Sequence, residues 1–122
     1  MSRRRSGEMV RGLYLMRIAL VHSHYDPAHL AEVKRQMLTL GAPAIHAVWM
    51  ECYGHYQALE GCHRLRAAAE LGLEPEIIEV EYSDELCSTI PGYDGDNDYP
   101  ISEICDDGHR AVTIEYNEEG KR

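Results

Sequence analysis

The feature that most constrains the fold is a stretch in the middle of the chain with the pattern of a strand, a tight turn and a helix. Tyr56 and Ala58 follow the alternation of a short strand, and Gly61 comes after them as a turn residue. From Cys62 onward the chain consists mainly of good helix formers, until Gly72 marks the helix end. We therefore predict a strand that leads directly into a helix through a glycine turn.

The start of this predicted helix is suited to an anion. The first turn of a helix presents backbone N–H groups without intrahelical partners, and Gly61 lets a ligand approach the backbone closely. His63 and Arg64 lie in the same turn, where the guanidinium can add charge-assisted hydrogen bonds to a phosphate. Cys62 lies beside them, and a helix N-terminus near an arginine favours the thiolate. The competing interpretation is an ordinary turn with a buried cysteine, a surface histidine and a solvated arginine.

Residues 60–64 (Glu-Gly-Cys-His-Arg), followed by two alanines at 67–68 and a helix that ends in glycine, resemble the Gly-Cys-His-Arg signature of the sulfiredoxins. More broadly, they resemble the Gly-x-(His/Arg)-Arg-x-x-Ala-Ala pattern of the ParB/sulfiredoxin superfamily of nucleotide-binding domains, over residues 16–82. The resemblance implies a single compact domain of the α+β (or α/β) class, with a small mixed sheet and two main helices. The whole sequence agrees, because it predicts four or five short strands and two principal helices.

The resemblance also implies a chemistry. In sulfiredoxins the cysteine of this motif is catalytic, and the neighbouring residues hold the phosphates of ATP. Carried over, Cys62 would be the nucleophile, Gly61 and His63 would be phosphate ligands, and Arg64 would both bind phosphate and lower the thiol pKa. ATP with magnesium would phosphorylate a cysteine sulfinic acid on a peroxiredoxin-like protein. The Cys62 thiolate would then attack the sulfinyl phosphate to give a thiosulfinate.

The first predicted helix departs from the sulfiredoxin pattern. Sulfiredoxins complete the phosphate site with a lysine, a serine and a threonine on the helix that follows Asp-Pro. The matching positions here are His29, Glu32 and Gln36. Lys34 or Arg35, on the next face of the helix, would then supply the positive charge for the phosphates.

A second hypothesis is a stand-alone ParB-like module that binds ATP or another nucleotide without a catalytic cysteine. Such a module could be a small-metabolite kinase, with Glu32 or Glu60 as the general base, or a regulatory domain without turnover. The chain is too short and too acidic for a DNA partition protein. The sequence leaves open whether the protein is an enzyme.

Charge and length bound the remaining possibilities. The chain has 122 residues and a formal net charge of −9, which argues for one domain and against a general nucleic-acid binder. We expect a basic flexible arm over residues 1–12, a ParB/sulfiredoxin-like core over 13–82, and an acidic loop with a final edge strand over 83–122. Four irregularly spaced cysteines, no signal peptide and no membrane-spanning run favour a cytoplasmic protein with reduced thiols; two disulfides in an oxidising compartment are the alternative.

The flanking segments give further elements. Residues 13–21 and 44–50 predict strands, and Asp26-Pro27 predicts the start of a helix that ends at Gly41. We expect the following apolar side chains to face the core: Leu30, Val33, Met37 and Leu40 from this helix, and Ile78, Val80 and Tyr82 from a strand after the central helix. Residues 83–108 lack periodicity and predict a solvated loop, whereas residues 110–116 predict the last strand.

Three groups of side chains could suggest a metal, but none has a convincing spacing. The groups are His22 with His24; Cys52, His55, Cys62 and His63; and Asp94, Asp96 and Asp98. The first two match no common zinc module. The third resembles the start of a calcium-binding EF-hand loop, yet Tyr99 replaces the required glycine and Cys105 replaces the final glutamate. We predict no metal site.

Overall fold

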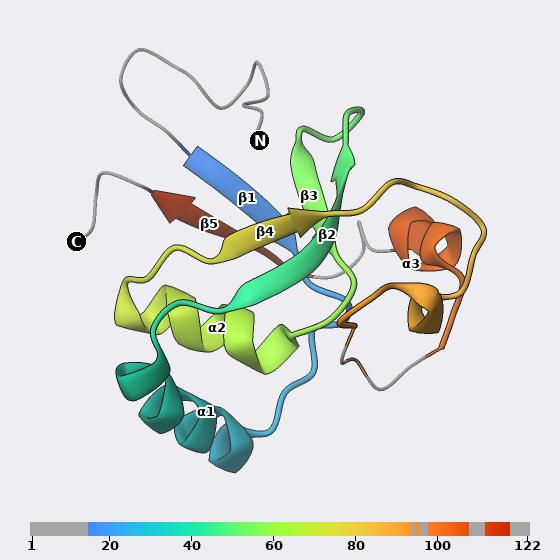
Figure 1. The fold of residues 1–122 in the computed structure, drawn as a ribbon. Helices are drawn as coiled ribbons and strands as arrows, with labels where there is room; N and C mark the ends of the chain where they lie inside the picture. Colours follow the sequence, from blue (N-terminus) through green and yellow to red (C-terminus); the bar gives the residue numbers. More distant parts are fainter. Residues whose placement is uncertain (1–14, 94, 96–97, 108–111, 118–122) are drawn as a thin grey trace.

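The structure, a computed structural model, describes residues 15–93, 95, 98–107 and 112–117. These residues form a five-stranded mixed sheet in the order β4-β2-β3-β1-β5 (Figure 1). The strands are β1 (Leu15–Ala19), β2 (Ala44–Met50), β3 (His55–Ala58), β4 (Glu76–Glu79) and β5 (Thr113–Asn117). The helices are α1 (Pro27–Leu40), α2 (Cys62–Leu71) and α3 (Ile101–Asp107), with a short 3-10 helix, η2 (Cys87–Thr89). The predicted α+β class, with a small mixed sheet and two main helices, is confirmed.

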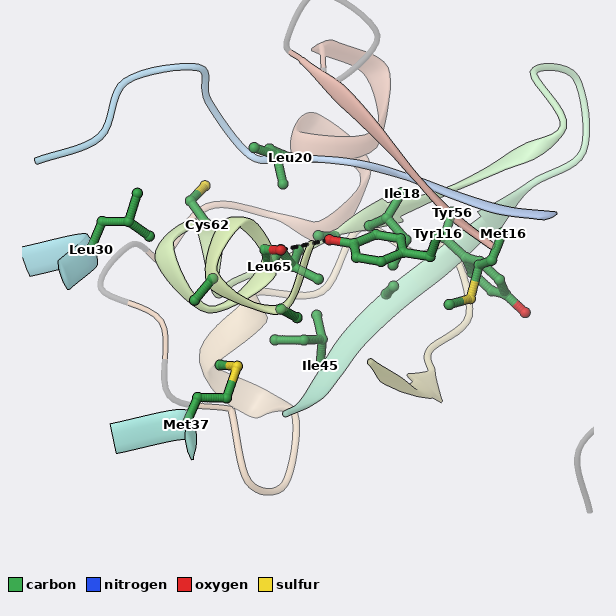
Figure 2. Close-up of a cluster of buried hydrophobic side chains, with 14 residues drawn as sticks. Met16, Ile18, Leu20, Leu30, Met37, Ile45, Tyr56, Cys62, Leu65 and Tyr116 are labelled. Carbon is green, nitrogen blue, oxygen red and sulfur yellow. Dashed lines mark hydrogen bonds between the residues drawn. The ribbon is translucent and has the colours of Figure 1, made fainter. Parts of the chain in front are cut away.

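The two main helices pack together on one face of the sheet (Figure 1). Between them and the sheet lies the larger apolar cluster, to which α2 contributes Leu65 and Cys62 (Figure 2). The Tyr116 hydroxyl of β5 donates a 2.7 Å hydrogen bond to the Leu65 carbonyl. Helix α2 is therefore fixed to the sheet both by burial and by a buried polar contact.

The opposite face of the sheet is covered by η2 and α3, which corrects the expectation of a solvated loop over residues 83–108. A second apolar cluster forms there and includes Cys87, Ile101, Ile104 and Cys105. The last three have the i, i+3, i+4 spacing of one helix face, which is a short signal inside an acidic, turn-rich segment. The predicted edge strand is confirmed, because β5 ends the sheet beside β1.

Helix α1 begins as its sequence predicts. The Asp26 side chain caps the helix by accepting a 3.1 Å hydrogen bond from the Ala28 N–H, and Pro27 occupies the first position. Leu30 and Met37 are buried as expected. Leu40, in the last turn of α1, is not: it is 79% exposed.

The apolar phase of β4 also differs from the prediction. Val80 packs on the α3 side, as an inward residue should, but Ile78 and Tyr82 are exposed. Ile77 packs instead against the cluster beneath α1 and α2. The strand ends at Glu79, and Ile77 within it and Val80 just after it contact different clusters, so one alternating apolar face does not describe this segment.

Some sequence predictions lie outside the described residues, among them the basic arm over 1–12 and the carboxylates of Asp94 and Asp96. Within the part of the chain that is described, no helix is both long enough and apolar enough to cross a membrane. The same part brings together no group of three or more metal-ligating side chains. All four cysteines are unpaired: Cys52 is exposed, and the other three are buried.

Candidate functional site

A pocket of about 490 Å³ lies where α2 begins, and its walls come from α1, the segment after α1, residues 60–64, and Val21, His22 and Gly95. This volume is within the range of about 300–1,000 Å³ that is typical of small-molecule sites. All four residues of the Gly-Cys-His-Arg motif line it. The glycine turn and the helix start predicted from the sequence therefore lie at a concave site.

Gly61 lies in the turn that starts α2, with φ 77° and ψ 35° in the left-handed region. A Cβ atom at this position would lie 2.5 Å from Cδ1 of Ile45 on β2. The Gly61 carbonyl accepts the first hydrogen bond of the helix, from the Leu65 N–H at 2.8 Å. Among the described residues, no side chain caps this end of the helix, so the N–H groups of its first turn lie beside the pocket.

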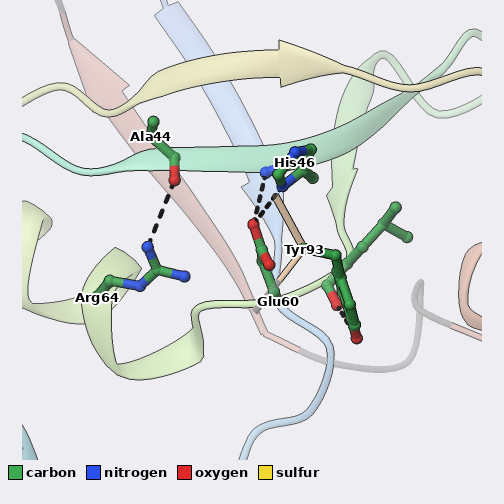
Figure 3. A network of polar contacts seen from close by, with 6 residues as sticks. Ala44, His46, Glu60, Arg64 and Tyr93 are labelled. Carbon is green, nitrogen blue, oxygen red and sulfur yellow. Dashed lines mark hydrogen bonds and ion pairs between the residues drawn. The ribbon is translucent and has the colours of Figure 1, made fainter. Parts of the chain in front are cut away.

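Arg64 extends back along this turn from the first turn of α2. Its Nη2 and Nε atoms lie 3.4 and 3.5 Å from the point where a Gly61 Cβ would be. One end of the guanidinium donates to the Ala44 carbonyl of β2, with an Nη1–O distance of 3.4 Å (Figure 3). The charge is thus held above the glycine turn, at the wall of the pocket.

His63 is held in one tautomer of its neutral form by its neighbours. Its Nε2 atom accepts a 2.9 Å hydrogen bond from the Asp26 N–H, so a neutral ring carries its proton on Nδ1. The ring packs edge-on against His29, with centroids 4.4 Å apart. Burial, and next the charge of His29, lower the pKa of His63 below its ordinary value of 6.5. At neutral pH His63 is therefore a neutral side chain with one N–H to donate.

Cys62 lines the pocket, but its side chain is only 7% exposed and belongs to the apolar cluster beneath α2 (Figure 2). Its thiol donates a long contact to the His22 carbonyl, with an Sγ–O distance of 3.7 Å. A nucleophilic role for Cys62 requires the segment around His22 to move, because that segment covers the sulfur.

Glu60 is a buried carboxylate at the pocket wall, with a partner that the sequence analysis missed. Its Oε2 accepts a 3.1 Å hydrogen bond from the backbone N–H of His46 and lies 2.6 Å from Nδ1 of the His46 ring (Figure 3). Both side chains are buried. The available signal was a histidine in the middle of a strand that is otherwise apolar, where a buried polar group needs a partner.

The charged residues of α1 that were predicted as ligands do not line the pocket. Lys34 forms a 2.8 Å ion pair with Glu70 of α2. Arg35 pairs with Glu32, and the hydrogen bond from Arg35 is the largest influence that holds the pKa of Glu32 below its ordinary value. Lys34, Arg35 and Glu32 are therefore engaged in ion pairs outside the pocket lining.

Other residues of α1 do reach the pocket. His29 and Gln36, two of the three positions matched to the sulfiredoxin phosphate site, line it. Val33 and Met37 add apolar surface from the same helix. The pocket thus joins a polar end at the start of α2 to an apolar wall on α1.

Comparisons of the chain with protein-family models, with curated proteins and with solved structures gave no match. The class of site therefore rests on its geometry. The start of α2, the Arg64 guanidinium and the neutral His63 ring lie around one pocket, and each of these groups can donate hydrogen bonds to an anion.

Proposed function

We propose that the protein binds a nucleotide, ATP with magnesium or another, through phosphates at the first turn of α2. The observation that carries this proposal is that residues 61–64 form one wall of the pocket. The backbone N–H groups of that turn, the Arg64 guanidinium and the Nδ1–H of His63 would be the phosphate donors.

The mixed character of the pocket favours a nucleotide over a bare phosphate. Its polar end can hold a phosphate chain, whereas Val33, Met37 and Leu40 offer apolar surface of the kind that packs against a base. Glu60 adds a negative charge to the wall, but its carboxylate is already bonded to the buried His46. Arg64 and the helix start therefore set the local preference for an anion, although the whole chain is acidic.

The first prediction concerns ligand-induced stabilisation. We expect ATP, ADP or CTP, with or without magnesium, to raise the melting temperature of the protein. A ligand at 100 times its Kd adds about 2.7 kcal/mol to the free energy of unfolding. Arg64→Ala should abolish most of the shift, because it removes the only guanidinium among the residues described at the pocket. The measurement is a thermal denaturation screen of both proteins.

Arg35→Ala is the matched control for this screen. It also removes an arginine, but one that forms a surface pair with Glu32 and does not line the pocket. The control should keep the full shift. If none of the nucleotides raises the melting temperature of the wild type, or if both variants lose the shift equally, the proposed site is wrong.

A sulfiredoxin-like reaction is the second candidate, and it is favoured by Cys62 lying in the same turn as the proposed phosphate site. A sulfinate oxygen of the substrate would attack the γ-phosphorus of ATP and release ADP. The Cys62 thiolate would then attack the sulfinyl sulfur and displace phosphate, so that a thiosulfinate S–S bond forms. The thiol must first become exposed, since it is covered in this structure.

A kinase that transfers the γ-phosphate of ATP to a small hydroxyl compound is the alternative reaction at the same nucleotide site. Of the two carboxylates considered as general bases, Glu60 lines the pocket and Glu32 does not. Glu60 would accept the hydroxyl proton while the hydroxyl oxygen attacks the γ-phosphorus, and ADP would leave.

The second prediction separates these two reactions with one pair of variants. Cys62→Ser should abolish reduction of a sulfinylated peroxiredoxin if the first reaction is correct, with Cys52→Ser as the control at an exposed cysteine. ADP formation with a hydroxyl metabolite should survive Cys62→Ser but not Glu60→Gln if the second is correct. Full sulfinate reduction by Cys62→Ser would eliminate the first reaction, and full kinase activity of Glu60→Gln the second.

A further inference from the structure

The segment between β1 and α1, residues 22–26, lies along the start of α2 and is called the strap below. All five of its residues, from His22 to Asp26, are exposed. In contrast, the Cys62 side chain beneath the strap is 7% exposed. The Cys62 thiol lies 3.7 Å from the His22 carbonyl oxygen, so the strap covers it on that side, while the apolar cluster surrounds it on the other.

Three residues of α2 hold the strap. Arg66 donates a 2.9 Å hydrogen bond to the Ser23 carbonyl, and its guanidinium carbon lies 4.2 Å from the centre of the Tyr25 ring. The other two contacts come from the first turn: His63 Nε2 accepts from the Asp26 N–H at 2.9 Å, and the Cys62 thiol lies 3.7 Å from the His22 carbonyl oxygen. The hydrogen bonds reach the backbone of the strap, so they do not depend on which side chains the strap carries.

We propose that the strap opens and closes over Cys62, and that the neutral imidazole of His63 holds it closed. Of these contacts, the one made by His63 is lost on protonation, because an imidazolium has an N–H at both nitrogens and cannot accept from the Asp26 N–H. In acid two N–H groups would face each other across 2.9 Å, and the end of the strap would be repelled from α2.

The charges around His63 come from every element that contacts it. His29 of α1, His22 of the strap and Arg66 of α2 disfavour the proton, whereas Asp26 favours it. Burial is the largest influence, and the net effect lowers the pKa of His63 below 6.5. The closed state thus binds fewer protons than the open state. Closure is fully favoured above pH 6.5 and weakens as the pH falls below that value.

The expected pH dependence is opposite to that of an ordinary histidine at an anion site. There, protonation adds a positive charge and tightens binding as the pH falls. Here, protonation removes an acceptor that the fold uses, and Cys62 becomes accessible. The strap therefore provides the exposure of the thiol that a reaction at Cys62 requires, and acid favours it.

The third prediction tests the strap by thiol modification, without any nucleotide or substrate. The native protein is treated with an aromatic disulfide reagent between pH 7.5 and 5.0, and the rates at Cys62 and Cys52 are measured by mass spectrometry. Cys52 is exposed, so the ratio of the two rates removes the common effect of pH on thiolate formation. We expect this ratio to rise by up to about tenfold for each pH unit below 6.5.

Two variants assign the effect to the contacts. His63→Gln has no titrating group at this position. Its ratio of Cys62 to Cys52 modification rates should therefore not change with pH, whether that ratio is high or low. Arg66→Ala should raise the ratio at every pH, since it removes the hydrogen bond to the Ser23 carbonyl and the contact with the Tyr25 ring that hold the strap. Cys87 and Cys105 are buried on the other face of the sheet and report global unfolding. A flat ratio in the wild type, an unchanged rise in His63→Gln, or parallel modification of Cys87 and Cys105 would overturn the proposal.

Discussion

Replacement of Leu65 by alanine is expected to lower the free energy of unfolding by about 2–5 kcal/mol, the usual range for a leucine deleted from a core. The Leu65 side chain is 0% exposed and lies in the cluster between α2 and the sheet (Figure 2). Its loss removes apolar contacts and leaves a cavity, because the helix is already held to β5 by the hydrogen bond from Tyr116 and cannot simply collapse inward. Urea denaturation followed by circular dichroism measures the effect.

Leu38→Ala is the matched control, since it makes the same chemical change on α1, where the side chain is 73% exposed. Its effect should stay within about 0.5 kcal/mol. Equal losses in the two variants would mean that Leu65 is not part of the core. Below its melting temperature, Leu65→Ala should still bind nucleotide, because the residue supports α2 from below and does not line the pocket.

Elements that depend on local chemistry were predictable from the sequence. The cap at Asp26, the proline that follows it, and the glycines at both ends of α2 each satisfy a backbone requirement within a few residues. The motif at residues 61–64 was predicted to be a turn leading into a helix, and the structure has that arrangement at the edge of a pocket. For the same reason, the boundaries of α1 and α2 agree closely with the predictions.

Features set by packing between distant segments were not predictable in this way. The exposure of Leu40 depends on which distant segments pack against the last turn of α1, and the orientation of Ile77 depends on the pairing of β4 with β2. Helix α3 has only seven residues in an acidic segment, which is too short for a clear helical pattern. Its apolar residues can be interpreted only when the apolar cluster on the second face of the sheet is known.

In the pocket, too, contacts between sequence neighbours were predictable and contacts between distant segments were not. The sequence grouped Gly61 with Arg64 because they are neighbours, but it could not place Lys34, which pairs across to α2. Nor could it find that His46 is the partner of Glu60, or that Arg66 holds the strap, because these contacts join residues 14 and 43 positions apart. Long side chains on a helix surface have several reachable partners, and the fold selects among them.

The fifth prediction concerns the glycine turn itself. Gly61→Ala is expected to lower the free energy of unfolding by about 2–5 kcal/mol, from a left-handed backbone that an L-residue resists and from a clash in a packed core. The clash is specific, since the new Cβ would lie 2.5 Å from Cδ1 of Ile45. Relief of the clash must move either the buried Ile45 side chain or the start of α2. To the extent that the start of α2 moves, the nucleotide-dependent shift in melting temperature should also fall.

Two further variants separate the backbone cost from the clash. Gly72→Ala places the same methyl group at the other end of α2, where φ is 75° and nothing lies within 4 Å, so it should cost only about 1–2 kcal/mol. Ile45→Val removes the clashing atom; alone it should cost about 0.5–1.5 kcal/mol, but combined with Gly61→Ala it should restore part of the lost stability. If the two substitutions simply add, or if Gly61→Ala and Gly72→Ala cost the same, the turn does not pack against β2 as described. A double variant that also regains nucleotide stabilisation would tie the ligand site to the position of this one turn.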